Sequence, residues 1–256
     1  GLILEKPTDK QDAYPHLKDS PETLHGYILQ CNDMVWPLFS HLENAVREGT
    51  NEVKIRFMDA MHSIARLTGK DVATAFDLSP YNMACDNGGC TGAMAYEFTK
   101  AHPGLSVIVF DLPQVIEVRR HFQPKENDDR VSFVGGRFFK DDLPKADLYI
   151  LARILHDWSD EKLNVLLSKL SKMCTPGCGL LVSEIFLDEE RKRPSRALLQ
   201  ALSMTEGKQR STTEYRDLLE KHGVTPKHIK HTDNLLDAIL FVKEKKKREG
   251  TCGQVW

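Results

Sequence analysis

The segment His156-Asp157-Trp158 holds the side chain of this sequence best suited to proton transfer. It follows the apolar run Leu148–Leu151 and precedes a helix predicted over 160–173, for which Ser159 is a suitable N-cap. His156 is therefore expected near the carboxyl end of a central strand, where open α/β sheets bind their ligands. An imidazole with a pKa of ~6.5 can accept a proton from a hydroxyl group at neutral pH. The alternative is a purely structural histidine.

A carboxylate is predicted beside this imidazole. Glu184 directly follows the apolar run Gly179–Ser183, which is expected to be the next strand of the same sheet. Because parallel strands end at the same edge, Glu184 can hold the His156 ring in one tautomer, as the acid of a catalytic triad does. The alternative role of Glu184 is to cap a helix or a loop.

A glycine-rich stretch indicates a cofactor site. Asp86–Gly92 (DNGGCTG) follows the apolar run Met83–Cys85 and precedes a predicted helix. Glycines let the backbone turn sharply and let a ligand come close. Asp111 lies 19 residues after Gly92, at the end of the run Leu105–Phe110, where an acid can bind ribose hydroxyls. This order of loop, helix, strand and acid favours a cofactor that contains adenosine.

The charge of the loop narrows the choice of cofactor. The glycines stand at 88, 89 and 92, which is not the GxGxxG spacing of dinucleotide sites, and no Lys-Ser or Lys-Thr follows as in a P-loop. Asp86 at the mouth of the loop would repel a pyrophosphate but tolerates the ammonium and sulfonium of S-adenosylmethionine. A nicotinamide oxidoreductase is therefore disfavoured. A structural turn with a surface Asp at each strand end stays open as an alternative.

The elements that must position these residues follow from hydropathy. From residue 72 onward, short apolar runs alternate with amphipathic stretches, which predicts a parallel sheet covered by helices on both faces. The runs are 83–85, 105–110, 131–134, 148–151, 179–183 and 238–242, and helices are expected over 25–48, 55–67, 93–100 and 160–173. We divide the chain into an irregular and helical segment 1–68, a cofactor-binding domain 69–243 and a basic tail 244–256.

Composition excludes several classes of protein. The chain has 256 residues, a net charge of −2 and 41% hydrophobic residues, so a substantial core is expected and a dedicated nucleic-acid binder is not. No apolar run reaches the ~20 residues that span a bilayer, and residues 1–10 have no signal-peptide character. Six cysteines without a CxxC spacing predict reduced thiols in a cytoplasmic protein and no zinc site.

Several longer strings resemble the plant-type small-molecule O-methyltransferases, over roughly residues 25–243. The matching strings are FMDAMH (57–62), DNGGCTGA (86–93), VFDLP (109–113), FFKDDLPKADLYILARILHDWSDEK (138–162), PGCGLLVSEIFLDEE (176–190) and TEGKQRSTTEY (205–215). The resemblance implies a Rossmann-like, seven-stranded class I methyltransferase sheet with an antiparallel last strand, preceded by a short helical segment. It implies methyl transfer from S-adenosylmethionine to the hydroxyl of a small aromatic acceptor, such as an N-acetylated hydroxyindole. The family's dimerisation region matches at most in its last part, and a homodimer is the expected assembly.

The resemblance also implies roles for individual residues. His156 matches the family's catalytic base, and Glu184 and Gln209 match the two acids that flank it. The expected cofactor contacts are Asp86, Gly88, Asp111, Leu112, Arg137, Phe138 and Arg153, and the expected acceptor contacts are Met61, Trp158 and Met204.

Three departures from the family pattern favour an alternative. Arg137 replaces the acid that meets the adenine amino group, and an arginine has no acceptor atom. Gln209 lacks the charge of the second flanking acid, and the chain around 203–205 is about one helical turn short. The alternative function is a cofactor-binding module that has lost catalysis and serves a regulatory or interaction role.

Overall fold

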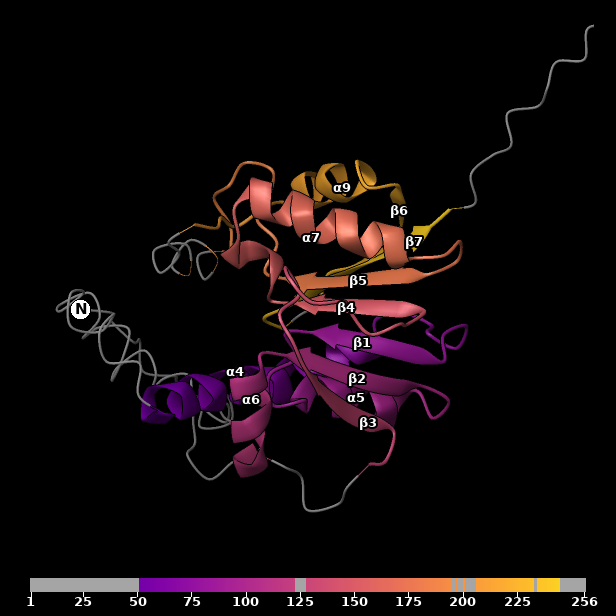
Figure 1. Cartoon of the computed structure of the whole chain (residues 1–256). Coiled ribbons are helices and arrows are strands. Elements are labelled where there is room, and N and C mark those ends of the chain that lie inside the picture. Colours follow the sequence, from indigo (N-terminus) through magenta and orange to yellow (C-terminus); the bar gives the residue numbers. More distant parts are fainter. Residues whose placement is uncertain are drawn as a thin grey trace, which may run out of the picture.

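One seven-stranded sheet organises the chain, with the strand order β3-β2-β1-β4-β5-β7-β6 (Figure 1). The computed structural model describes residues 51–122, 128–194, 197, 200, 206–232 and 234–244, with side chains from residue 58 onward. The strands from β3 to β5 are parallel, and β7 runs antiparallel to both β5 and β6. The predicted fold class, including the antiparallel last strand, is confirmed.

The apolar runs of the sequence become strands with small shifts of their ends. The strands are β1 Met83–Asn87, β2 Ser106–Asp111, β3 Val131–Gly135, β4 Leu148–Ala152, β5 Gly179–Glu184, β6 Val224–Lys230 and β7 Asp237–Lys243. Hydropathy gave no sign of β6, because this edge strand is largely exposed and contains Pro226. Only its neighbour β7, with five buried residues at its start, makes it part of the sheet.

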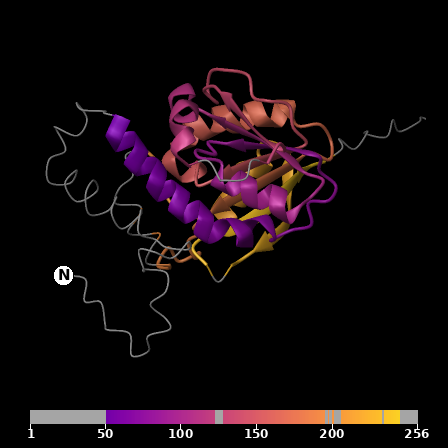
Figure 2. The same ribbon diagram turned by 90° about the horizontal axis from the view of Figure 1, so that it is seen from below.

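The helices predicted over 55–67, 93–100 and 160–173 are all present, and two further helices, α6 Pro113–Val118 and α9 Thr212–Glu220, lie between later strands. The three predicted helices are α4 Asn51–Ala73, α5 Ala93–Ala101 and α7 Asp160–Met173, and there are short 3₁₀ turns, η3 Arg119–Phe122 and η4 Leu155–Asp157. The Ser159 side chain caps α7 as predicted, since it accepts a hydrogen bond from the Lys162 amide at 3.4 Å. α4 is longer than the expected 55–67, so the domain division at 68/69 falls inside one helix (the long indigo helix of Figure 2). The predicted helix 25–48 and most of the tail 244–256 lie outside the described residues.

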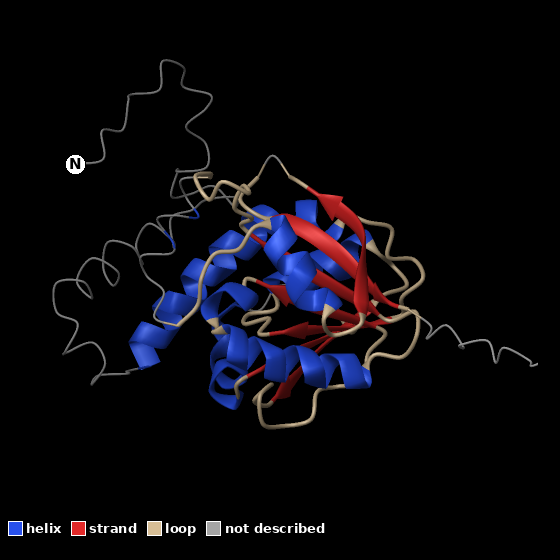
Figure 3. Ribbon diagram, turned by 90° about the horizontal axis from the view of Figure 1, so that it is seen from above, coloured by secondary structure: helices blue, strands red, loops and turns tan. Residues whose placement is uncertain are grey.

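Alternate residues of each strand enter two separate cores. Tyr149 and Leu151 pack with α7 and α9, whereas Leu148 and Ile150 pack with α4 and α5 on the opposite face. This two-residue period is the reason why the buried strands read as continuous apolar runs. Figure 3 shows the resulting layers, with helices on both sides of the sheet. Within the described part of the chain, no helix combines the length and the apolar character that a bilayer crossing takes.

The carboxyl ends of β1, β2, β4 and β5 meet at one edge of the sheet. β1 lies between β2 and β4, so the chain leaves β1 toward β2 on one side and reaches β4 on the other. Such a switch point leaves a crevice beyond the strand ends. Gly88 (φ 76°) follows β1 and faces the side chain of Ile154, which follows β4, so closely that a Cβ at position 88 would overlap it. The glycine loop and the histidine segment are therefore neighbours.

Candidate active site

His156 is held in the 3₁₀ turn η4 at the end of β4, and its side chain is 4% exposed. Its Nδ1 lies 2.6 Å from Oε2 of Glu184, the last residue of β5. The other carboxylate oxygen, Oε1, accepts a hydrogen bond from the Leu155 amide at 2.9 Å. The pairing of Ala152 with Ser183 brings the two strand ends side by side, as the sequence predicted.

The second ring nitrogen of His156, Nε2, has two neighbours: one can donate to the neutral ring and the other can accept from the protonated ring. Nε2 lies 3.0 Å from the Gln200 amide nitrogen and 3.1 Å from Asp157 Oδ1. With Nδ1–H donated to Glu184, a neutral ring accepts at Nε2 from the Gln200 amide. A protonated ring instead donates from Nε2 to Asp157. The site can therefore hold a proton on His156 or release it without leaving a ring nitrogen unpaired.

Opposing forces act on the charge of His156. Burial disfavours the imidazolium, but the Glu184 carboxylate and the hydrogen bonds that the ring donates to Asp157 and Glu184 outweigh burial and raise the pKa of His156 to about 9. A phenol-like hydroxyl has a pKa of ~10, so transfer of its proton to this imidazole is nearly balanced. The free protein holds His156 mainly as the imidazolium at neutral pH.

Gln209, the predicted second flanking residue, makes no hydrogen bond to His156. It is buried, and neither its amide oxygen nor its amide nitrogen has a hydrogen-bond partner among the described residues. Asp157 and Gln200 occupy the second ring nitrogen of His156 instead. The sequence reasoning missed Gln200 because it lies 44 residues from His156 in a stretch without a chemical motif.

The Asp86 carboxylate lies against Gly89 of the glycine loop, where a Cβ at position 89 would overlap Oδ2. It is buried there and is not a surface residue. β1 continues to Asn87, two residues beyond the predicted strand, and Asp86 is 1% exposed. Its Oδ2 is buried without a hydrogen-bond partner among the described residues. Burial, together with the nearby Asp111 carboxylate, raises the pKa of Asp86 to about 7. A cationic ligand beside Asp86 would stabilise the ionised carboxylate and lower its pKa again.

Asp111 ends β2 as predicted and is tied to the glycine loop. Its Oδ2 accepts from the Cys90 amide at 2.9 Å, and its Oδ1 accepts from the Leu112 amide at 2.7 Å. Burial raises the pKa of Asp111 above its ordinary value. A carboxylate has further acceptor sites on both oxygens, so ribose hydroxyls can still bind. His62 of α4, which the sequence reasoning did not single out, also reaches the loop, with its Nδ1 2.9 Å from Thr91 Oγ1.

Comparison with known proteins assigns this arrangement to a family. The O-methyltransferase domain family matches residues 38–225. The chain belongs to the O-methyltransferase family. The family predicted from the sequence is therefore confirmed, as is S-adenosylmethionine as the cofactor of that family.

Individual O-methyltransferase relatives are similar to this chain over most of its length. Bovine acetylserotonin O-methyltransferase is 39% identical over 89% of this chain and 73% of its own length. A human protein described as a probable bifunctional dTTP/UTP pyrophosphatase/methyltransferase is 47% identical over 88% of this chain. The match spans only 40% of that human protein. The solved structure of human N-acetylserotonin methyltransferase in complex with SAM superposes with a TM-score of 0.82 at 35% identity, over 91% of this chain and 74% of the other.

The remaining cofactor residues predicted for this O-methyltransferase line the same edge of the sheet. Leu112 is 45% exposed at the start of α6. Arg137 is exposed, next to Gly136, whose amide donates to the Asp111 carbonyl at 2.8 Å. Arg153 follows β4 in a left-handed conformation (φ 58°), and its Nε is buried without a partner among the described residues. Phe138 packs edge-on against Trp158, with ring centroids 6.1 Å apart.

The predicted acceptor residues are only partly brought together. Trp158 is half-buried and packs edge-on against both Phe138 and Phe139, and the Lys162 ammonium lies 4.9 Å from its ring centroid. Met61 is half-buried on α4, and Met204 lies outside the described residues. The contact of these side chains with an acceptor stays a prediction.

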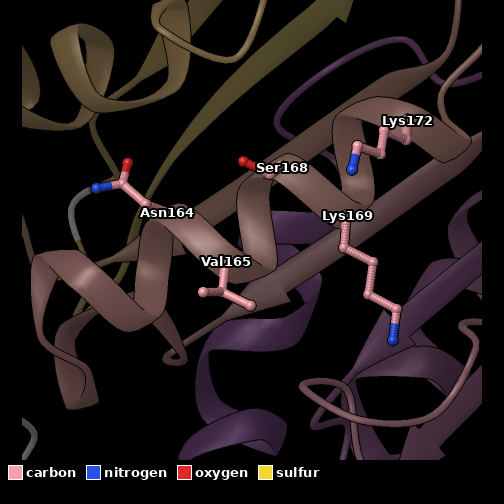
Figure 4. Close-up of a pocket in the computed structure, with 5 residues that line it drawn as sticks. All are labelled: Asn164, Val165, Ser168, Lys169 and Lys172. Carbon is pink, nitrogen blue, oxygen red and sulfur yellow. The ribbon is translucent and has the colours of Figure 1, made fainter.

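A hollow of about 480 Å³ runs along the outer side of α7, and Figure 4 shows the side chains that line it. They are Asn164, Val165, Ser168, Lys169 and Lys172, all from this one helix. Lys169 is tied to the loop before β4, since its ammonium donates to the Phe138 carbonyl at 3.2 Å. The hollow contains none of the residues at the strand ends, so we assign it no part in the chemistry.

Proposed function

We propose that this protein transfers a methyl group from S-adenosylmethionine to the hydroxyl of a small aromatic alcohol, such as an N-acetylated hydroxyindole. The observation that carries the proposal is the buried His156–Glu184 pair beside the glycine loop. The His156 imidazole is a proton acceptor held by the Glu184 carboxylate, at the carboxyl ends of the strands next to the glycine loop. The acetylserotonin relatives support the acceptor class by their names.

The residues at the ends of β1 and β2 fit S-adenosylmethionine. Asp86 presents a buried carboxylate oxygen without a partner among the described residues, and Asp111 keeps acceptor sites free for hydroxyls. Two carboxylates close together resist ionisation, and a cationic ligand relieves both. When bound, the cofactor supplies a methyl group activated by a positive sulfur.

The chain's own part is proton transfer and orientation. His156 takes the acceptor's hydroxyl proton at Nε2, the nitrogen that Gln200 covers in the structure. An acceptor hydroxyl must therefore displace the Gln200 amide. Glu184 stabilises the imidazolium that forms, because its carboxylate lies 2.6 Å from Nδ1. Base assistance of this kind contributes ~10²–10⁴-fold, and alignment of the reactants contributes more.

The second candidate is a cofactor-binding module without catalysis. Two features favour this candidate. One is Arg137 at the cofactor edge, by which we mean the carboxyl ends of β1, β2 and β3 with the glycine loop. The other is the side-chain amide of Gln209, which has no hydrogen-bond partner among the described residues. The shortened stretch 203–205, which also motivated it, lies outside the described residues. For both candidates we expect a cytoplasmic location, which cell fractionation tests. For both we also expect a homodimer, which light scattering on the purified chain tests.

One experiment separates the candidates. We would titrate the protein with S-adenosylmethionine and S-adenosylhomocysteine by calorimetry, and then assay methyl transfer to a panel of aromatic alcohols that includes an N-acetylated hydroxyindole. Binding with turnover supports the enzyme. Binding without turnover on any alcohol supports the module, and absence of binding contradicts both.

A further inference from the structure

Arg210 is a fully buried arginine with no role in the chemistry described so far. It is 2% exposed and precedes the capping residue of α9. Its guanidinium reaches back by about fifty residues to the turn that carries His156. One terminal nitrogen donates to the Leu155 carbonyl at 3.0 Å, and the other donates to the Trp158 carbonyl at 3.4 Å and to Asp160 Oδ1 at 2.5 Å.

These bonds bracket His156 on both sides. Leu155 precedes it, and Trp158 and Asp160 follow it at the start of α7. On the opposite side of the turn, the amide of Leu155 donates to Glu184. The backbone of the turn is thus held through its N–H groups by Glu184 and through its carbonyls by Arg210. Without the hydrogen bonds to Glu184 and Arg210 the conformation of the turn would be poorly fixed, because a 3₁₀ turn of this length has few hydrogen bonds of its own.

The segment around Arg210 is fitted closely to the same turn. Gly207 faces the peptide between His156 and Asp157, where a Cβ at position 207 would overlap the His156 carbonyl oxygen. Lys208 and Lys162 add ion pairs between the two segments, at 3.0 Å to Asp160 and 2.6 Å to Glu206. Exposed pairs of this kind contribute little stability. The buried guanidinium and the glycine therefore determine how the segments meet.

We propose that Arg210 is a positioning residue for the methyl-transfer reaction: it clamps the His156 turn between Glu184 and the start of α7, with Gly207 providing the close approach. The inference rests on the proposed function only for its effect on turnover. An arginine is required because its planar fork of N–H donors reaches a carbonyl and a carboxylate at the same time, which the single ammonium of lysine does not.

The main test is Arg210→Lys, which keeps the charge and removes the fork. We expect kcat to fall by ~10–100-fold, since small displacements of a catalytic group cost this much. The dissociation constant of S-adenosylmethionine should stay within about twofold of the parent value, because Arg210 bonds the turn after β4 and the start of α7 and not the glycine loop. Arg216→Lys is the matched control: Arg216 is 45% exposed on α9 beside Asp217, and both values should be unchanged in this variant.

The second readout does not depend on methyl transfer. NMR titration of the His156 ring in the parent and in Arg210→Lys reports how well Glu184 and Asp157 face the imidazole. Since the total charge is unchanged, a displaced turn lowers the measured pKa of His156 toward its ordinary value of 6.5. If the parent chain shows no turnover on any acceptor, the proposed function fails while this titration still tests the clamp.

A third variant covers the case in which Arg210→Lys does not fold. Gly207→Ala changes no charge and forces residues 206–210 away from the turn, so it should also lower kcat and the pKa of His156. Circular dichroism establishes that each variant is folded at the assay temperature. An unchanged pKa of His156 in every folded variant of this pair overturns the proposal, as does a lower melting temperature with kcat unchanged.

Discussion

Asp86, at the glycine loop, and His156, in the turn after β4, differ in how far their polar atoms are paired. At the cofactor edge, Asp86 is buried with an oxygen that has no partner among the described residues, and its pKa is raised to about 7. At the catalytic turn, both ring nitrogens of His156 are paired, and its pKa is raised to about 9. A buried carboxylate oxygen without a partner is costly and is stabilised when a cationic ligand binds, whereas the paired ring nitrogens of His156 fix its geometry before a ligand arrives. The cofactor edge is completed by binding, and the catalytic turn is preorganised.

The largest effect is expected at the preorganised half. His156→Ala should lower turnover by ~100-fold or more, because the variant lacks the imidazole that accepts the proton. Cofactor affinity should change by less than about threefold, since the glycine loop is untouched. His231→Ala on the exposed surface is the control and should keep the parent turnover. Equal loss of affinity and turnover would show that the two halves are not separate.

The pH dependence of kcat/KM tests the charge of the same residue. Below pH 9 the proton on His156 must leave before it can act as a base, so the rate should rise about tenfold per pH unit and level off near pH 9. The stability of the folded protein changes in the opposite direction and falls as the pH rises. A histidine whose pKa is raised in the folded state stabilises fully below about pH 6.5, and this contribution is lost as the pH rises through about 9. A rate profile that levels off near pH 6.5 would contradict the role of Glu184.

The next effect is expected at the cofactor edge. Asp111→Ala should weaken the binding of S-adenosylmethionine by ~1–3 kcal/mol, or about 5–150-fold in the dissociation constant, because the ribose hydroxyls lose their acceptor. Calorimetry measures the loss directly. Asp129→Ala, on an exposed turn before β3, should leave the affinity unchanged. Parent-like affinity in Asp111→Ala would remove Asp111 from the site.

A smaller effect distinguishes the two halves through pH. The pKa of Asp86 is raised in the folded protein, so its ionisation lowers stability progressively from about pH 4, and the loss is complete above about pH 7. A cationic ligand offsets this penalty. S-adenosylmethionine should therefore raise the melting temperature more at pH 8 than at pH 6, and Asp86→Asn should abolish the difference. Identical shifts at both pH values in the parent chain would contradict ligand contact with Asp86.

The smallest effect concerns Arg137. Arg137→Asp replaces an exposed cation at the cofactor edge with an acceptor for the adenine amino group. We expect tighter binding of S-adenosylmethionine by ~2–5-fold, limited by solvent screening. Lys140→Asp makes the same charge reversal on the same loop without the predicted contact. An equal gain in both variants would mean a general charge effect, and weaker binding in Arg137→Asp would mean that Arg137 has a role of its own.

Local pattern was sufficient for most of the fold. Apolar runs located six of the seven strands, and Ser159 marked the start of α7. Both signals depend on neighbouring residues, since burial on two faces needs a continuous apolar run and a cap needs a polar side chain beside a helix. β6 could not be predicted because its exposed residues resemble a loop until β7 pairs with them.

The sequence by itself also determined which residues stand at the strand ends, namely Asp111, His156 and Glu184. Strand order in a parallel sheet then brings His156 and Glu184 within 2.6 Å, as the pattern predicted. Only the tertiary structure decided what surrounds them. Gln200 and Arg210 reach His156 and Leu155 from 44 and 55 residues away, and Gln209 makes no hydrogen bond to His156. Burial of Asp86 also depends on the whole sheet, because the helices and strands that exclude water from it come from distant parts of the chain.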